Sequence, residues 1–283
     1  MFTLIAQNKY GQRLELTHNQ AYVVKSIEGI DPPEGVINTT RNADADGSVF
    51  NSAYVNNRQI IITLAINGPA EQNRINLYKY FKSKYPVRLF YKNESRDVYI
   101  DGYVKKPMID FFAEKQIAQI TIFCPSPFFK GATDIITDFS SVESAFEFPF
   151  EIEAADPIEF GIIIDEIEKN IIYHGDVETG AVITLDARGS VANPIIANLD
   201  TNQFFKLNLS MARGDRIIIN TTKKQKSARL ISNGVVSNVV GSIADGSTWL
   251  QILPDDNMLQ ITATSGSENL DAYVAVTEQF EGV

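Results

Sequence analysis

Residues 214–221 read Gly-Asp-Arg-Ile-Ile-Ile-Asn-Thr, a tight turn that leads into a run of β-branched apolar residues. Such a run is typical of a buried β-strand. Residues 249–257 read Trp-Leu-Gln-Ile-Leu-Pro-Asp-Asp-Asn, a second strand that ends in a turn of Pro, Asp and Asn. Neither stretch holds a nucleophile, a general base or a phosphate-binding loop. This part of the chain therefore predicts β-structure without a catalytic motif.

Similar short apolar runs lie on both sides of these two stretches. Gly, Asn and Asp separate them at close intervals, which favours an antiparallel β-sandwich over residues 131–283. The expected strands include 158–164, 181–185, 204–209, 217–220, 228–232, 249–253, 258–263 and 273–277. No helix is needed in this half.

The first half of the chain predicts a β-rich domain with one helix. The expected strands are 59–66, 87–91 and 98–104. A helix is expected between the first two, because Leu77, Phe81 and Tyr85 recur at intervals of four residues. Pro69 fits its start and Pro86 its end.

Length, composition and charge predict two domains of different character. The 283 residues are 44% hydrophobic and 21% charged, as in globular proteins. Residues 125–131, Pro-Ser-Pro-Phe-Phe-Lys-Gly, suggest a stiff boundary, which gives domains 1–130 and 131–283. The first carries 16 Lys and Arg against 12 Asp and Glu, and the second 9 against 23. Neither a membrane span nor a signal peptide is recognised, so cytoplasmic synthesis and no membrane contact are expected.

Residues 29–58 are expected to form a long, irregular, turn-rich segment that includes Phe50 and Tyr54. Such segments inside compact domains are usually either functional or disordered. A contact arm and a mobile surface loop are the two interpretations that the residues leave open.

Residues that could carry chemistry are few. Asp44 and Asp46 suggest a calcium loop, but the sixth and twelfth positions of that pattern are Val49 and Val55 instead of Gly and Glu. The two histidines have no ligand or triad partner at a recognisable spacing, and Cys124 lies in an apolar run. We therefore expect no catalytic residue, no metal and no cofactor.

The order of the turn at Gly214, the strand starting at Trp249, the following turn and the final Gly282-Val283 resembles the C-terminal half of the distal tail (Dit) proteins of long-tailed siphovirus phages and prophages. Asp255 stands where that family usually has a turn glycine. The Cys-Pro-x-Pro-Phe-Phe run at 124–129 resembles the end of the family's first domain. The resemblance implies a mainly β fold: a split-barrel-like N-terminal domain with one helix and an arm, and a galectin-like C-terminal β-sandwich.

The resemblance further implies a non-enzymatic hub of the phage tail tip or baseplate, located in the virion. Six copies would form a hexameric ring through which DNA only passes, joining the major tail tube protein to the tail-associated tip protein and to receptor-binding or baseplate proteins. The expected contacts between subunits lie on the arm, at Arg41, Asp44, Asp46, Phe50 and Tyr54.

The alternative function is a lectin-like module that binds host cell-wall carbohydrate through the second domain. The galectin sugar site needs His-x-Asn-Pro-Arg, whereas Asn193-Pro194 is followed here by Ile195 and has no nearby histidine. Trp249 is therefore expected to belong to the core instead of a sugar site. A wall hydrolase is the weakest interpretation.

Overall fold

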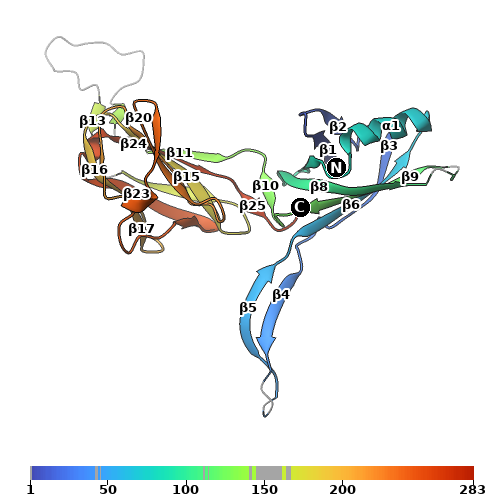
Figure 1. The fold of residues 1–283 in the computed structure, drawn as a ribbon, viewed down its shortest axis with the longest axis horizontal. Coiled ribbons are helices and arrows are strands. Elements are labelled where there is room, and N and C mark those ends of the chain that lie inside the picture. Colours follow the sequence, from blue (N-terminus) through green and yellow to red (C-terminus); the bar gives the residue numbers. More distant parts are fainter. Residues whose placement is uncertain are drawn as a thin grey trace, which may run out of the picture. The chain divides into compact units, whose positions relative to one another are not determined.

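The protein consists of two β-rich units in a computed structural model (Figure 1). The structure describes residues 2–139 except 42, 43, 45, 111 and 114, together with 142–144, 161–163 and 167–283. The first unit contains Met1–Ala132 and Gln279–Val283, and the second contains Thr133–Glu278. The last five residues thus return to the first unit, whereas the sequence pattern places them in the second domain. The predicted mainly β class, with one α-helix among the described residues, is confirmed.

The first unit is organised around one antiparallel sheet with the order β2-β1-β7-β8-β9-β6-β3, in which β10 also pairs with β8 and β25 pairs with β10. Its strands are β1 (Thr3–Asn8), β2 (Arg13–Glu15), β3 (Tyr22–Glu28), β6 (Arg58–Ile66), β7 (Pro86–Lys92), β8 (Asp97–Ile109), β9 (Ile117–Cys124), β10 (Phe129–Gly131) and β25 (Gln279–Phe280). Residues alternate between buried and less buried along β6 and β9, as expected when one sheet face packs on a core.

The helix α1 (Ala70–Tyr80) covers the core of this unit. Leu77 and Phe81 are buried in the same cluster as Ile62 and Leu64 of β6, which explains the apolar spacing. The predicted helix is confirmed, but it ends before Phe81. Tyr85 therefore lies beyond the helix and does not extend its apolar face.

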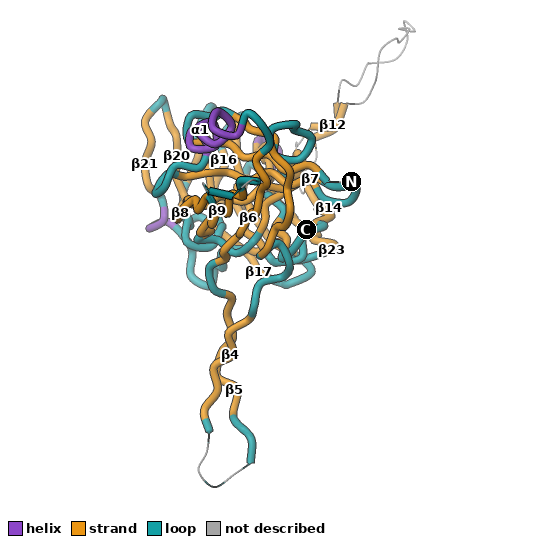
Figure 2. The backbone as a smooth tube through the Cα atoms, turned by 90° about the vertical axis from the view of Figure 1, so that its right-hand side faces the viewer, coloured by secondary structure: helices purple, strands orange, loops and turns teal. Residues whose placement is uncertain are grey.

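Residues 29–58 are not irregular as predicted. They contain β4 (Gly35–Thr40) and β5 (Val49–Val55), which pair as a two-stranded antiparallel hairpin. The hairpin extends away from the sheet of its own unit in both views (Figures 1 and 2). The turn-forming residues were recognised correctly, but they flank two strands instead of filling the segment.

The second unit is a sandwich of two antiparallel sheets. One has the order β11-β24-β15-β19-β20-β21 with β22 beside β15, and the other has β14-β23-β16-β17 with β18 beside β16. The strands are β11 (Ile135–Phe139), β14 (Ile167–Tyr173), β15 (Thr179–Ala187), β16 (Val191–Asn198), β17 (Gln203–Lys206), β18 (Ser210–Met211), β19 (Arg216–Asn220), β20 (Ser227–Ser232), β21 (Val235–Asn238), β22 (Gln251–Ile252), β23 (Asp255–Ser265) and β24 (Leu270–Val276). Two short 3₁₀ turns lie at Val240–Ser242 and Ser267–Asn269.

One hydrophobic core joins the two sheets of this unit. Ile217 and Ile219 of β19 are fully buried in it, together with Leu259 of β23. The turn before β19 is closed by Asp215, whose carboxylate accepts a hydrogen bond from the backbone N–H of Ala212 at 2.8 Å. The stretch 214–221 therefore forms the predicted turn and buried strand.

Two other expectations concern particular segments of the second unit. Trp249 packs against this core, with its ring centroid 5.0 Å from that of Phe205, as predicted. Of the expected strand 158–164, only residues 161–163 are described, and they form β13 (Gly161–Ile163), paired with β12 (Val142–Ser144). The rest of that strand lies outside the described residues.

Candidate subunit interface

The β4–β5 hairpin exposes several large apolar side chains, which two paired strands cannot cover by themselves. Four of its side chains, Ile37, Val49, Phe50 and Tyr54, are each more than half exposed. A two-stranded hairpin is only marginally stable by itself, and exposed apolar groups of this size mark interaction sites. The hairpin is therefore the strongest candidate for a docking element in the described chain.

A β-bulge decides which of these side chains share a face. Ile37 pairs with Ala53, but the register shifts by one residue after Asn38, so that Thr39 pairs with Phe50 and Asn51 is the extra residue. Directly paired residues point to the same side of a sheet, and a shift of one residue reverses the side. The bulge therefore places Phe50 on the face of Ile37 and Ala53.

The opposite face of the hairpin mixes apolar and polar groups. It carries Tyr54, which pairs with Val36, and Val49, which pairs with Thr40. Between them lies the pair Asn38 and Ser52, whose side chains form a hydrogen bond of 3.0 Å. The two faces thus offer different surfaces, one centred on Ile37 and Phe50 and the other on Tyr54 and Val49 beside amide and hydroxyl groups.

The structure places all five predicted interface residues on the hairpin but not in one patch. Arg41, Asp44 and Asp46 are exposed at the turn that joins β4 and β5, and among the described residues they form no ion pair. Phe50 and Tyr54 lie on opposite faces. The sequence analysis missed Ile37, because residues 35–40, Gly-Val-Ile-Asn-Thr-Thr, show no alternation of apolar and polar residues that would indicate a strand.

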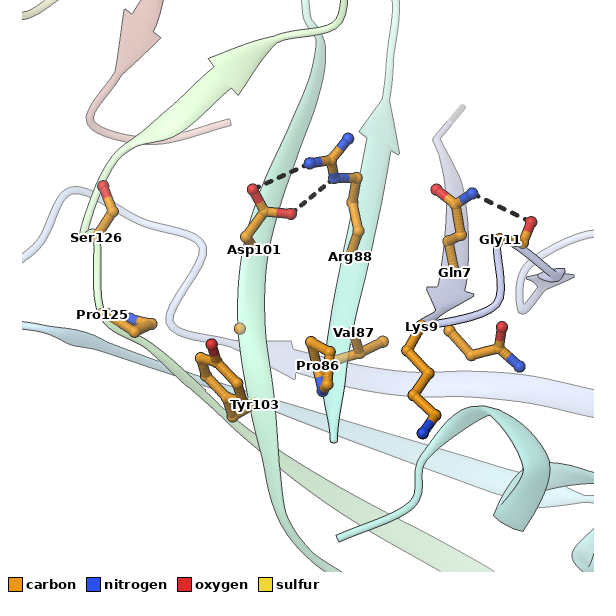
Figure 3. A pocket seen from close by; sticks show the side chains of 12 residues that line it. Gln7, Lys9, Gly11, Pro86, Val87, Arg88, Asp101, Tyr103, Pro125 and Ser126 are labelled. Atoms are coloured by element: carbon orange, nitrogen blue, oxygen red, sulfur yellow. Dashed lines mark hydrogen bonds and ion pairs between the residues drawn. The ribbon is translucent and has the colours of Figure 1, made fainter. Parts of the chain in front are cut away.

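A hollow of about 580 Å³ lies over β1, β7 and β8 of the first unit (Figure 3). The Arg88 guanidinium donates two hydrogen bonds to the Asp101 carboxylate, at 2.7 and 3.2 Å, and Gln7 donates one to the Gly11 carbonyl. The bond to Asp101 raises the pKa of Arg88, so the guanidinium stays charged. Because Arg88 cannot act as a base and Asp101 is bound to it, this pair does not supply acid–base chemistry.

A second hollow of about 580 Å³ lies on the second unit. Its floor is aliphatic, with Ile218 and Val236, and its rim carries Lys224, Lys226 and Arg229. No aromatic ring lines it, so a sugar ring would have no stacking platform there. Over the described residues, no group of three His, Cys, Asp or Glu side chains is placed to hold a metal ion.

None of the described helices is long and apolar enough to cross a bilayer.

Comparisons with known proteins find similarity to phage tail and baseplate proteins. Residues 174–280 match the family of siphovirus-type tail components, in its C-terminal domain. The structure is similar to the crystal structure of the SPP1 Dit (gp 19.1) protein, with a TM-score of 0.70 and 15% identity over 99% of both chains. It is also similar to two structures of the phage P2 baseplate in its activated conformation, with Ca and with Sr, with a TM-score of 0.51 and 11% identity over 100% of both chains. No curated protein sequence matches the chain.

The predicted resemblance to distal tail proteins is therefore confirmed. The chain has the fold of SPP1 Dit over almost its whole length, and residues 174–280 match the C-terminal domain of siphovirus-type tail components.

Proposed function

We propose that this protein is the structural hub of a phage tail tip, and that six copies form a ring joining the tail tube to the host-adsorption apparatus. Two observations support the proposal. The fold is that of SPP1 Dit, which is described as a paradigm of the hub of the adsorption apparatus in phages infecting Gram-positive bacteria. The hairpin also carries apolar side chains, among them Ile37 and Phe50, that only a partner can cover.

The projecting hairpin is the main structural support for the proposed ring. In a closed ring, each subunit contacts the next through two different surfaces, so each must present one surface and accept another. A projecting ribbon can present Ile37 and Phe50 to the neighbouring subunit. Buried aromatic residues dominate the energy of such contacts. The role requires neither a catalytic residue nor a cofactor.

The other partners follow from a hub placed between tube and tip in the virion. One face of the ring would meet the tail tube protein, and the other a tip protein and the receptor-binding proteins. DNA would pass through the lumen without being bound.

The mass of the protein in solution tests the ring. Light scattering after gel filtration is expected to give about six times the 31.5 kDa of one chain, with rings visible by negative-stain microscopy. A variant in which a short turn replaces residues 36–56 is expected to be monomeric while keeping its circular dichroism spectrum. A variant that folds and still forms the ring would show that the hairpin is not the contact.

The second candidate, a lectin-like module, is favoured by one observation. Lys224, Lys226 and Arg229 surround a hollow in a unit rich in acidic residues, which suits an anionic wall polymer. Binding of the intact protein to cell-wall polysaccharide, lost on reversal of these three charges, would favour this function. No binding at micromolar concentration is expected if the hub proposal holds.

A further inference from the structure

Arg58 occupies a core position at the start of β6. It is 4% exposed and is followed on the inward side of the strand by Ile60 and Ile62. Its Nη1 donates hydrogen bonds of 2.8 Å to the carbonyl oxygens of Gly29 and Asp31. The side chain thus holds, through two hydrogen bonds, the segment that leads into the hairpin.

The remaining donors of the same guanidinium reach two distant segments. Nε donates to the Pro127 carbonyl at 2.6 Å, and Nη2 donates to the Glu281 carbonyl. The guanidinium also lies 4.8 Å from the centre of the Phe129 ring. The charges of Glu281 and Asp31 lie near enough to stabilise the charged form of Arg58.

A buried charge is costly unless hydrogen bonds and neighbouring charges replace its hydration. Burial lowers the pKa of Arg58, which reflects that cost. The planar guanidinium supplies five donors on three separate nitrogens, whereas a lysine ammonium has three donors on one nitrogen. An arginine at this core position therefore joins three backbone segments through hydrogen bonds.

These three segments have distinct places in the chain. Residues 29–32, the root, lead into β4. Pro127 lies between β9 and β10, on the way to the second unit. Residues 279–283, the strap, follow the second unit and begin with β25, which pairs with β10 through Phe129 and Phe280. Near each of the two chain connections to the second unit, one backbone carbonyl therefore accepts a hydrogen bond from Arg58.

The strap lies directly on the root. The backbone N–H of Val283 donates to the Ile30 carbonyl at 3.3 Å. A Cβ atom at Gly282 would lie 3.0 Å from Cδ of Pro32, so this position has no room for a side chain unless the root moves. Arg96 covers the ring of Phe280, with 4.0 Å between guanidinium and ring centre.

We propose that Arg58 is a positioning residue, which clamps the strap onto the root and so fixes the direction of the β4–β5 hairpin. The consequence for assembly rests on the proposed ring. A hairpin held in one direction loses less conformational freedom when it binds the next subunit, so the clamp favours association.

Distances between spin labels test the proposal in the full chain. One label is placed on Ser48 near the hairpin turn and one on Lys79 of α1, with labelled protein diluted into unlabelled protein. The parent is expected to give one narrow distance distribution. Arg58→Met removes every donor, and Gly282→Val wedges the strap from the root while leaving Arg58 intact. Both variants are expected to broaden the distribution and to weaken ring formation at least tenfold.

Two control variants make the outcome decisive. Arg88→Met removes another arginine of the same sheet and is expected to keep the narrow distribution. Arg58→Lys keeps the charge but cannot bridge the segments, so broadening is expected there too. If the Arg58 variants lower the melting temperature and leave the distribution narrow, the residue is merely structural and the proposal is overturned.

The outcome for Gly282→Val is independent of whether the Arg58 variants fold. A narrow distribution in that variant would exclude the strap from the clamp and overturn the proposal. If the distributions broaden as expected but the parent is monomeric, the clamp stands and the proposed ring function is what fails.

Discussion

Asp255 adopts a left-handed backbone conformation, with φ of 71°, at the first position of β23. Residues other than glycine rarely adopt this conformation, because Cβ crowds the following carbonyl. The turn is fixed nearby by Asn257, whose side chain accepts a hydrogen bond from the N–H of Leu253 and donates one to its carbonyl. The glycine expected here from the resemblance to distal tail proteins therefore has a physical reason.

Relief of this strain can be measured. Asp255→Gly is expected to raise the free energy of unfolding by about 0.5–1 kcal/mol, and Asp255→Val to lower it by about 1 kcal/mol or more. Urea denaturation monitored by tryptophan fluorescence gives both values. Equal losses in the two variants would mean that the Asp255 side chain, and not the backbone angle, determines the stability of the turn.

Cys124 gives a prediction about pH. Burial raises the pKa of this thiol from 9.0 to about 12. In the unfolded chain the thiol ionises near its ordinary pKa, whereas in the folded protein it stays protonated up to about pH 12. The unfolded state therefore binds fewer protons over this window, and the free energy of unfolding falls as the pH rises from about 9 towards 12.

The test compares the parent with Cys124→Ala in urea at pH 7, 9 and 10. The parent is expected to lose more stability than the variant above pH 9, because only the parent has the thiol. Alkylation by iodoacetamide is expected to require unfolding. Rapid alkylation of the native protein at pH 8 would contradict the raised pKa.

Single residues also show what the sequence can predict of the candidate site. Phe50 and Tyr54 were recognised because aromatic residues are conspicuous in a polar segment. Their faces were not predictable, since they depend on the bulge at Asn51. Arg58 has a visible signal, a charge in phase with Ile60 and Ile62, but its acceptors are backbone carbonyls, one of them 223 residues away.

Among the elements, those with alternating burial were the most predictable. The strands β6, β7 and β8 and the helix α1 follow from local patterns, because each packs one face on a core. The hairpin does not, since both of its faces are exposed and no alternation between core and solvent remains to mark its strands. Its turn residues, such as Pro32 and Gly47, therefore dominated the prediction.

The bulge in β5 provides a test at this scale. Deletion of Asn51 restores regular pairing and moves Phe50 to the opposite face, away from Ile37. We expect ring formation to weaken about as much as in Phe50→Ala, because the apolar face of the hairpin is broken in both. Since the hairpin lies outside the core, the melting temperature of the monomer is expected to stay within about 2 °C of the parent value.

Light scattering over a range of concentrations measures this effect. Ser52→Ala changes only the face opposite to Ile37 and Phe50 and serves as the matched control. This variant is expected to assemble like the parent. If the deletion of Asn51 assembles like the parent, the face of Phe50 does not determine the contact.

In the whole molecule, the division into two β-rich units was suggested by composition and by the Pro-rich stretch near residue 125. The return of residues 279–283 to the first unit was not, because pairing between β10 and β25 joins segments about 150 residues apart and leaves no local pattern. The first unit is thus completed by residues that follow the second unit in the chain.

The charge of the whole molecule leads to a prediction about DNA. The formal net charge is −10, and six copies would carry about −60 by simple multiplication. Protein–DNA affinity depends on cations that release counter-ions from phosphates, so a strongly acidic ring disfavours binding. The first half of the chain has a small basic excess, with Lys82 and Lys84 exposed just after α1. We expect no retention of duplex DNA near physiological salt and little at low salt, measured by gel shift at micromolar protein. Retention that is abolished by Lys82→Glu with Lys84→Glu would instead identify a basic surface that contacts DNA directly.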